Sequence, residues 1–185
     1  MEICGEGVLE PVGRDAVIHW QYYPRGSQCP SHLTEVVSVF RRHGARISSD
    51  RKRRRHSNAV LSIVARDLKQ LDYRVETGKR REEKVTVPVL FGRNGEVEKS
   101  FDADAYNKNR STVIEVEAAS AVTGNQFLKD LFQASMMEGV QYCVIAVRNR
   151  SKATKDFDTV CRFMDTMYAS DRLRLPLSGV LLIGY

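Results

Sequence analysis

Residues 141–147, QYCVIAV, form a nearly continuous apolar run directly after Gly139 and Val140. Such a strand is typical of a sheet covered by helices, because neither of its faces tolerates water. Helical patterns flank the run, over about residues 123–137 and 154–168. This alternation predicts an α/β fold in which a parallel crossover joins neighbouring strands.

The other elements follow from periodicity and turn residues. Apolar residues recur at helical spacing over residues 32–43 and 57–71, and Gly44 is expected to end the first helix. The dipeptide Asn94-Gly95 is a strong hairpin signal. The expected strands are, in chain order, 16–22, 85–91, 96–106, 112–118, 141–147 and 179–183.

The length of 185 residues suits a single domain that can bury a substantial core. We expect a mixed central sheet flanked by helices, built by residues 57–148 as a helix, a three-strand meander, a helix and a strand. Residues 1–56 would form an N-terminal extension with a helix and an Arg-rich loop, and residues 149–185 would add a helix and a strand.

The composition predicts a soluble protein, with 42% hydrophobic and 28% charged residues. No apolar run approaches the roughly 18 residues that a membrane-spanning helix needs. The first residues carry acids where a secretory signal peptide carries basic residues. We therefore expect a cytoplasmic protein without a membrane partner.

Positive charge is concentrated in two short segments, although the net charge of +6 is modest. Dense basic clusters attract polyanions, and each phosphate that they neutralise releases counterions. The alternative is a solvated basic loop without a ligand. The candidate nucleic-acid-binding residues are Arg51, Lys52, Arg53, Arg54, Arg55, Lys79, Arg80 and Arg81.

Acidic residues alternate with apolar ones on two successive predicted strands. Glu115 and Glu117 share one face of their strand, and Asp102 and Asp104 share one face of the strand before it. Four carboxylates in such proximity repel one another unless a cation lies between them. Oxygen-rich sites suit Mg²⁺ or Mn²⁺, as one or two ions. The alternative is the solvent-facing side of an edge hairpin.

The register of these two strands depends on the loop between them. If residues 108–111 form the loop, Asn107 pairs with Thr112, so Asp104 lies opposite Glu115. The same register would place Asp102 opposite Glu117. Any even loop length keeps the acids on one face, whereas an odd length separates them.

Two acids nearer the N-terminus are further candidates for the site. Asp67 lies within the apolar stripe of the helix 57–71, where a carboxylate must be paired, hydrogen-bonded or near a metal. Its alternative is an ion pair with an arginine such as Arg66 or Arg74. Glu76, just before the sheet, is the rival acid.

These residues resemble the PD-(D/E)XK nuclease superfamily, whose fold is restriction-endonuclease-like. The likeness rests on a helix, Asp104 on the second strand, Glu115-x-Glu117 on the third, and a following helix and strand. It is greatest to the BamHI/BglII branch and related bacterial proteins. It covers roughly residues 57–147, and its motif is short and degenerate. Alanine precedes Asp104, where the family commonly has proline.

The resemblance implies that Asp104 and Glu115 bind Mg²⁺ together with the backbone carbonyl of Val116. Glu117 stands where most members have lysine, and in the BamHI-like branch a glutamate there is assigned to a second ion or to activation of water. Two ions can stabilise attacking water and leaving oxygen in phosphodiester hydrolysis. On the following helix, Lys129 would restore the missing ammonium, although its helical position favours the alternative of a solvent-exposed side chain. Gln133, one turn further, would face the site.

The expected function is a Mg²⁺-dependent endonuclease acting on DNA, with Asp104, Glu115 and Glu117 as catalytic residues. Relatives of this kind often act as homodimers, although the sequence offers no interface. One alternative is a non-catalytic nucleic-acid-binding module of the same fold, and another is a partner-dependent defence or toxin-type module. Metal-dependent nicking of DNA distinguishes the enzyme from the binding module.

Overall fold

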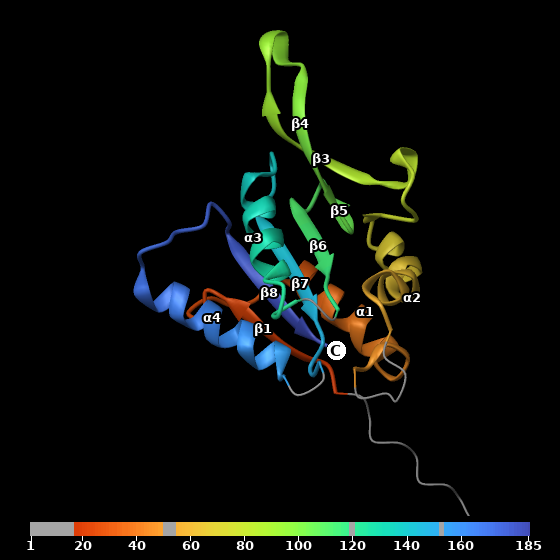
Figure 1. The fold of residues 1–185 in the computed structure, drawn as a ribbon, viewed down its shortest axis with the longest axis vertical. Helices are drawn as coiled ribbons and strands as arrows, with labels where there is room; N and C mark the ends of the chain where they lie inside the picture. Colours follow the sequence, from red (N-terminus) through yellow and green to blue (C-terminus); the bar gives the residue numbers. More distant parts are fainter. Residues whose placement is uncertain (1–16, 50–54, 119–120, 152–153) are drawn as a thin grey trace, which may run out of the picture.

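The computed structural model describes residues 17–49, 55–118, 121–151 and 154–185. The described part contains a mixed central sheet, a separate two-stranded sheet and four α-helices (Figure 1). Within it, no helix combines the length and apolarity that crossing a bilayer requires. The elements are β1 (His19–Tyr23), α1 (Ser31–Ile47), α2 (Ser57–Gln70), β2 (Arg74–Val75), β3 (Val85–Phe91), β4 (Val97–Ala103), β5 (Ala105–Asn107), β6 (Thr112–Val116), α3 (Gln126–Met136), β7 (Tyr142–Val147), α4 (Asp156–Ser170) and β8 (Gly179–Gly184), with short 3₁₀ turns at Arg81–Glu83 and Arg93–Gly95.

The central sheet has the order β1-β8-β7-β6-β5-β2. Strands β6, β7 and β8 run parallel, whereas β1, β5 and β2 pair antiparallel with their neighbours. Helix α3 connects β6 to β7 and α4 connects β7 to β8, which confirms the predicted α/β class. The N-terminal strand β1 pairs with the C-terminal strand β8, so both ends of the described chain contribute to one sheet.

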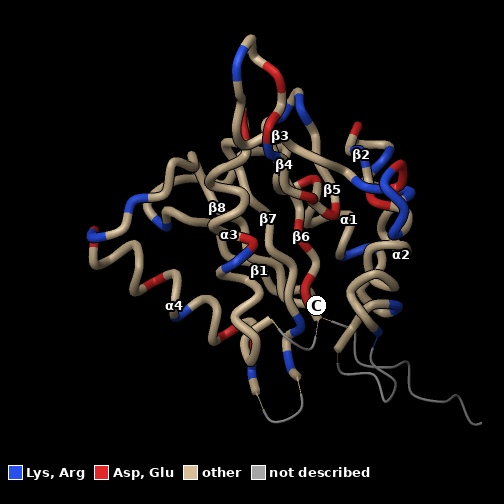
Figure 2. The backbone as a smooth tube through the Cα atoms, turned by 45° about the horizontal axis from the view of Figure 1, so that its top comes forward, with Lys and Arg blue, Asp and Glu red and all other residues tan. Residues whose placement is uncertain are grey.

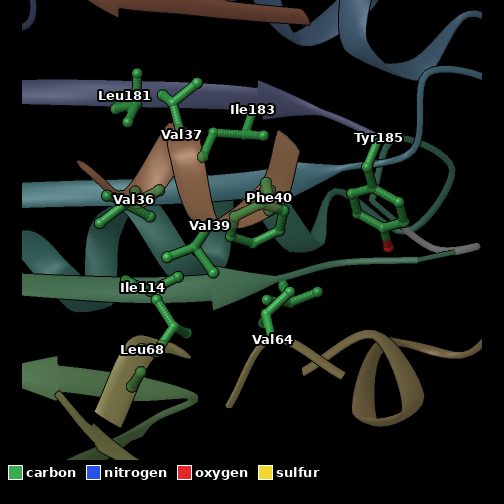
Figure 3. Packing of buried hydrophobic residues seen from close by; sticks show 14 of the residues in the cluster. Val36, Val37, Val39, Phe40, Val64, Leu68, Ile114, Leu181, Ile183 and Tyr185 are labelled. Atoms are coloured by element: carbon green, nitrogen blue, oxygen red, sulfur yellow. The ribbon is translucent and has the colours of Figure 1, made fainter. Parts of the chain in front are cut away.

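Both faces of the parallel strands are buried, as the apolar run at 142–147 predicted. On one face, Ile114 and Ile183 pack against α1 and α2, including Phe40, Val64 and Leu68 (Figure 3). On the other face the alternate strand residues Val113, Cys143, Ile145 and Leu182 pack with residues of α3 and α4. The parity of a residue on β6 therefore decides which helix pair it meets.

Helix α1 continues past Gly44, so the expected helix end at this glycine was wrong. Ile47 lies one further turn along the buried stripe and is only 1% exposed. Burying such a side chain contributes roughly 1.5–3 kcal/mol. This outweighs the cost of about 1 kcal/mol for glycine within a helix.

The predicted meander does not form one sheet. The expected strand 96–106 divides at Asp104: β4 pairs with β3 in the two-stranded sheet, and β5 pairs with β6 in the central sheet. We call Val85–Ala103 the arm, since it projects from the body (Figure 1). At its base, Val85, Val87 and Ala103 join the core. Nearer its tip, residues 96–99 are exposed.

Candidate functional site

Strand β6 carries Glu115 on the face that meets α3, because Val113 on the same parity packs there. The pairing of β5 with β6 confirms the expected register, with Asn107 opposite Thr112 and Ala105 opposite Ile114. Continuing this register places Asp104 opposite Glu115. The four-residue loop therefore brings these two acids together on one face of the sheet.

Asp104 lies at the bend where the chain leaves the central sheet for the arm. Its carboxylate Oδ2 accepts a hydrogen bond from the backbone N–H of Val116 at 2.7 Å. Its own carbonyl accepts one from the N–H of Glu76 at 2.8 Å. Both bonds hold the bend in place. The assignment of the Val116 carbonyl as a metal ligand stays a prediction, and the structure gives the Val116 N–H a role in orienting Asp104.

A fourth carboxylate, missed in the sequence, comes from α3. Asp130 is 4% exposed and lies on the buried stripe with Phe127, Leu131 and Ala134. Its side chain shares a hydrogen bond with that of Glu117, which acts to raise the pKa of Glu117 and to lower that of Asp130. Its Oδ2 atom has no hydrogen-bond partner. The spacing 127, 130, 131, 134 is the signal that could have identified it.

The carboxylic acids on and directly after β6, and Asp130 on α3, have raised pKa values. Burial raises the pKa of Glu115 well above its usual value, and the charges of Asp104 and Asp130 raise it further. Burial, together with Asp130, raises the pKa of Glu117 to about 8. Desolvation also raises the pKa of Asp130. Desolvation is the largest cause in all three cases, and neighbouring negative charges add to it for Glu115 and Glu117.

The pKa of Asp104 is raised to about 6, mainly by burial and further by Glu76 and Asp130. The hydrogen bond from Val116 and the charge of Lys84 oppose this rise. A cluster of carboxyl groups with strongly raised pKa values is typical of functional sites, where a cation can replace the retained protons.

Lys84 is a second residue missed in the sequence. Its ammonium donates a hydrogen bond to Glu76 Oε2 at 2.8 Å, and the Glu76 side chain is 12% exposed. That hydrogen bond is the main cause of the raised pKa of Lys84. Glu76 therefore reaches the site as half of an ion pair. No sequence signal identifies Lys84, because its position depends on how the arm leaves the sheet.

Asp102 does not join the cluster, and the expected pairing with Glu117 was wrong. Asp102 lies on β4 opposite Thr86, on the arm. Its side chain is 55% exposed, with Oδ2 4.0 Å from the ammonium of Lys84. The bend at Asp104 separates it from β6.

Asp67 takes an ion-pair role in the interface between α1 and α2. Its Oδ2 lies 3.0 Å from Arg42 Nε and 3.3 Å from His43 Nε2. Desolvation works to raise the pKa of Asp67, but the hydrogen bond and charge of Arg42, with those of His43, lower it overall. These partners come from the neighbouring helix, unlike the expected Arg66 or Arg74.

The two candidate residues on α3 differ in exposure. Lys129 is exposed, and its positive charge opposes the rise in the pKa of Glu117 and of Asp130. Gln133, one turn further along, is half-buried. Lys129 thus acts on the cluster through its charge.

The backbone of Glu117 is fixed at the carboxyl ends of the parallel strands. Its N–H donates to the carbonyl of Ala146 at 2.7 Å, and its carbonyl accepts from the hydroxyl of Tyr185 at 2.7 Å. Figure 3 shows Tyr185 beyond the end of β8. The buried Arg148 hydrogen-bonds the Tyr185 side chain and the carbonyl of Arg55.

The first basic cluster falls largely outside the described residues, which include Arg55 but not Arg51, Lys52, Arg53 and Arg54. The second is exposed, and Arg80 pairs with Glu82 and Glu83. Lys79 and Arg81 lie in the loop between Glu76 and Lys84. Figure 2 shows basic positions near β2 and acidic ones near β5 and β6.

As they stand, the described residues contain no group of three or more His, Cys, Asp or Glu side chains that could hold a metal ion. Comparisons with protein-family models, with curated proteins and with solved structures find no match to this chain. The chemistry of the site therefore follows from its own residues.

Proposed function

We propose that this chain is a divalent-cation-dependent endonuclease with a restriction-endonuclease-like core, hydrolysing phosphodiester bonds in DNA. The observation that carries the proposal is the register of β5 and β6, whose continuation places Asp104 opposite Glu115, with Glu117 two residues further along the chain. The order of α2, the strands, α3 and β7 agrees with the resemblance in the sequence.

The donor set fits a hard divalent cation. All the candidate ligands are oxygen atoms, and Asp130 Oδ2 is a buried acceptor without a partner. Asp104, Glu115 and Glu117 would hold Mg²⁺ or Mn²⁺ with the carbonyl of Val116, after rotation of their side chains. A bound cation supplies Lewis acidity toward the phosphate and lowers the pKa of attacking water.

The chain's other residues would position the substrate. Lys79 and Arg81 are exposed basic groups in the loop whose ends, Glu76 and Lys84, adjoin Asp104. They would contact phosphates and set the register of the duplex without reading its sequence. Lys84 is an ammonium close to the acids and would offset negative charge beside the scissile phosphate.

The test is nicking of supercoiled plasmid in Mg²⁺ or Mn²⁺, with wild type, Glu115→Gln and the exposed control Glu138→Gln. We expect cleavage by wild type and the control, loss with EDTA, and no cleavage by Glu115→Gln. Cleavage by Glu115→Gln at the wild-type rate would refute the assignment. Salt-sensitive DNA binding without nicking would instead identify a binding module.

A further inference from the structure

The environment of Asp130 lacks the partners that usually stabilise a buried carboxylate. It lies on the stripe of α3 that otherwise buries Phe127, Leu131 and Ala134. Among the described residues, no lysine, arginine or histidine forms an ion pair with it within 4.0 Å. Its side-chain hydrogen bond is with another acid, Glu117, and Oδ2 has none. A buried acceptor atom without a hydrogen-bond partner destabilises the folded state unless a ligand binds to it.

Asp130 and Glu117 belong to different elements that face each other. Glu117 follows β6, and its backbone is fixed by Ala146 and Tyr185. Asp130 is held by a helix packed on the same face of the sheet. Both positions are therefore set by backbone contacts that do not depend on the hydrogen bond between the two acids. Asp104 and Glu115 adjoin this pair, and their charges act on it.

We propose that Asp130 is a metal ligand and that, with Glu117, it forms a second divalent-cation position beside the one at Asp104 and Glu115. The inference rests on the proposed function, which supplies the first cation position at Asp104 and Glu115. Helix α3 thus contributes directly to the metal centre.

The test is a titration of the metal-free protein with Mn²⁺, in which free Mn²⁺ is measured by its electron paramagnetic resonance signal. The variants are Asp130→Asn, Glu117→Gln and the exposed control Glu138→Gln. We expect two Mn²⁺ ions per chain in wild type and in the control. We expect one ion in Asp130→Asn and one in Glu117→Gln, because each variant removes one ligand of the second position.

The outcomes separate the two proposals. Equal binding of two ions by wild type and Asp130→Asn would refute a ligand role for Asp130, as would a single ion in both with the same affinity. Either result would leave the nuclease proposal standing. Absence of Mn²⁺ binding in wild type would overturn both. Circular dichroism and thermal melting establish that each variant folds, and Glu117→Gln tests the position independently if Asp130→Asn does not fold.

Discussion

The carboxylate of Asp104 accepts the backbone N–H of Val116 at 2.7 Å, at the point where the strand beside β6 ends. The N–H of Glu117, one residue on, points the opposite way to Ala146 on β7. The Val116 N–H thus points to the side of β6 where β5 has ended, and the Asp104 carboxylate accepts it there in place of a backbone carbonyl of a neighbouring strand. Asp104 therefore has a structural task and a proposed chemical one, and variants must separate them.

Replacing Asp104 by asparagine should separate these tasks. Asparagine retains a side-chain oxygen for Val116 but loses the negative charge. We expect the Tm of Asp104→Asn to lie within a few degrees of the wild-type Tm, a change no larger than the loss of about one hydrogen bond would cause. We expect the same variant to lose cleavage. Asp104→Ala should lose cleavage and also about 1 kcal/mol of stability, measured by urea unfolding. Cleavage by the asparagine variant would contradict a ligand role.

The metal-free protein should become less stable as pH rises. Asp104 and Glu117 have pKa values of about 6 and about 8, above their ordinary 3.8 and 4.5. Between roughly pH 4 and 8, the native state holds protons that the unfolded state has released, so the free energy of unfolding decreases with pH. We expect Tm in EDTA to fall by roughly 5 °C between about pH 5 and 8. Mg²⁺ should restore Tm more at the alkaline end of this range, because ligands must be deprotonated. A flat profile that Glu115→Gln does not change would argue against a repelling acidic cluster.

Lys84→Met should impair turnover without weakening cation binding. Removing the ammonium leaves the Glu76 carboxylate unpaired and makes the cluster more negative, so Mn²⁺ affinity should stay equal or increase. Cleavage should fall by roughly tenfold to a hundredfold if the ammonium stabilises developing charge. Lys99→Met, at an exposed position of β4, is the matched control. Unchanged cleavage by Lys84→Met would limit this lysine to a structural ion pair.

The double variant Lys79→Ala/Arg81→Ala should weaken DNA binding for all sequences. The slope of log K against log salt should decrease by about 1–2, roughly one unit for each phosphate that is no longer neutralised. Arg162→Ala, at an exposed position of α4, serves as the comparison. Fluorescence anisotropy over a salt series measures both quantities. An unchanged slope would exclude this loop from the interface.

Asp67→Asn should affect stability alone. The change removes the charge that faces Arg42 and His43, and the loss should stay within about 1 kcal/mol for this partly exposed pair. Because the folded pKa of Asp67 is lowered, its contribution is present at neutral pH and disappears as pH falls through that pKa. Plasmid cleavage should equal that of wild type. Loss of cleavage with an unchanged Tm would contradict a purely structural role and support Asp67 as a residue of the site.

The sequence by itself determined the fold class and, for a four-residue loop, the register of two strands. Because side chains alternate along a strand, such a loop between Asn107 and Thr112 places Asp104 opposite Glu115. The nearly continuous apolar run at 141–147 indicated helices on both sides of the sheet.

Only the tertiary structure decided which acids meet. Because the chain bends at Asp104, Asp102 lies on the arm and not beside β6. The packing of α3 on the sheet places Asp130 near Glu117, and the packing of α1 against α2 pairs Asp67 with Arg42. Lys84 reaches Glu76 because the arm begins beside the sheet. These contacts join elements distant in the sequence, and their geometry depends on how the helices and the arm pack, which local periodicity does not encode.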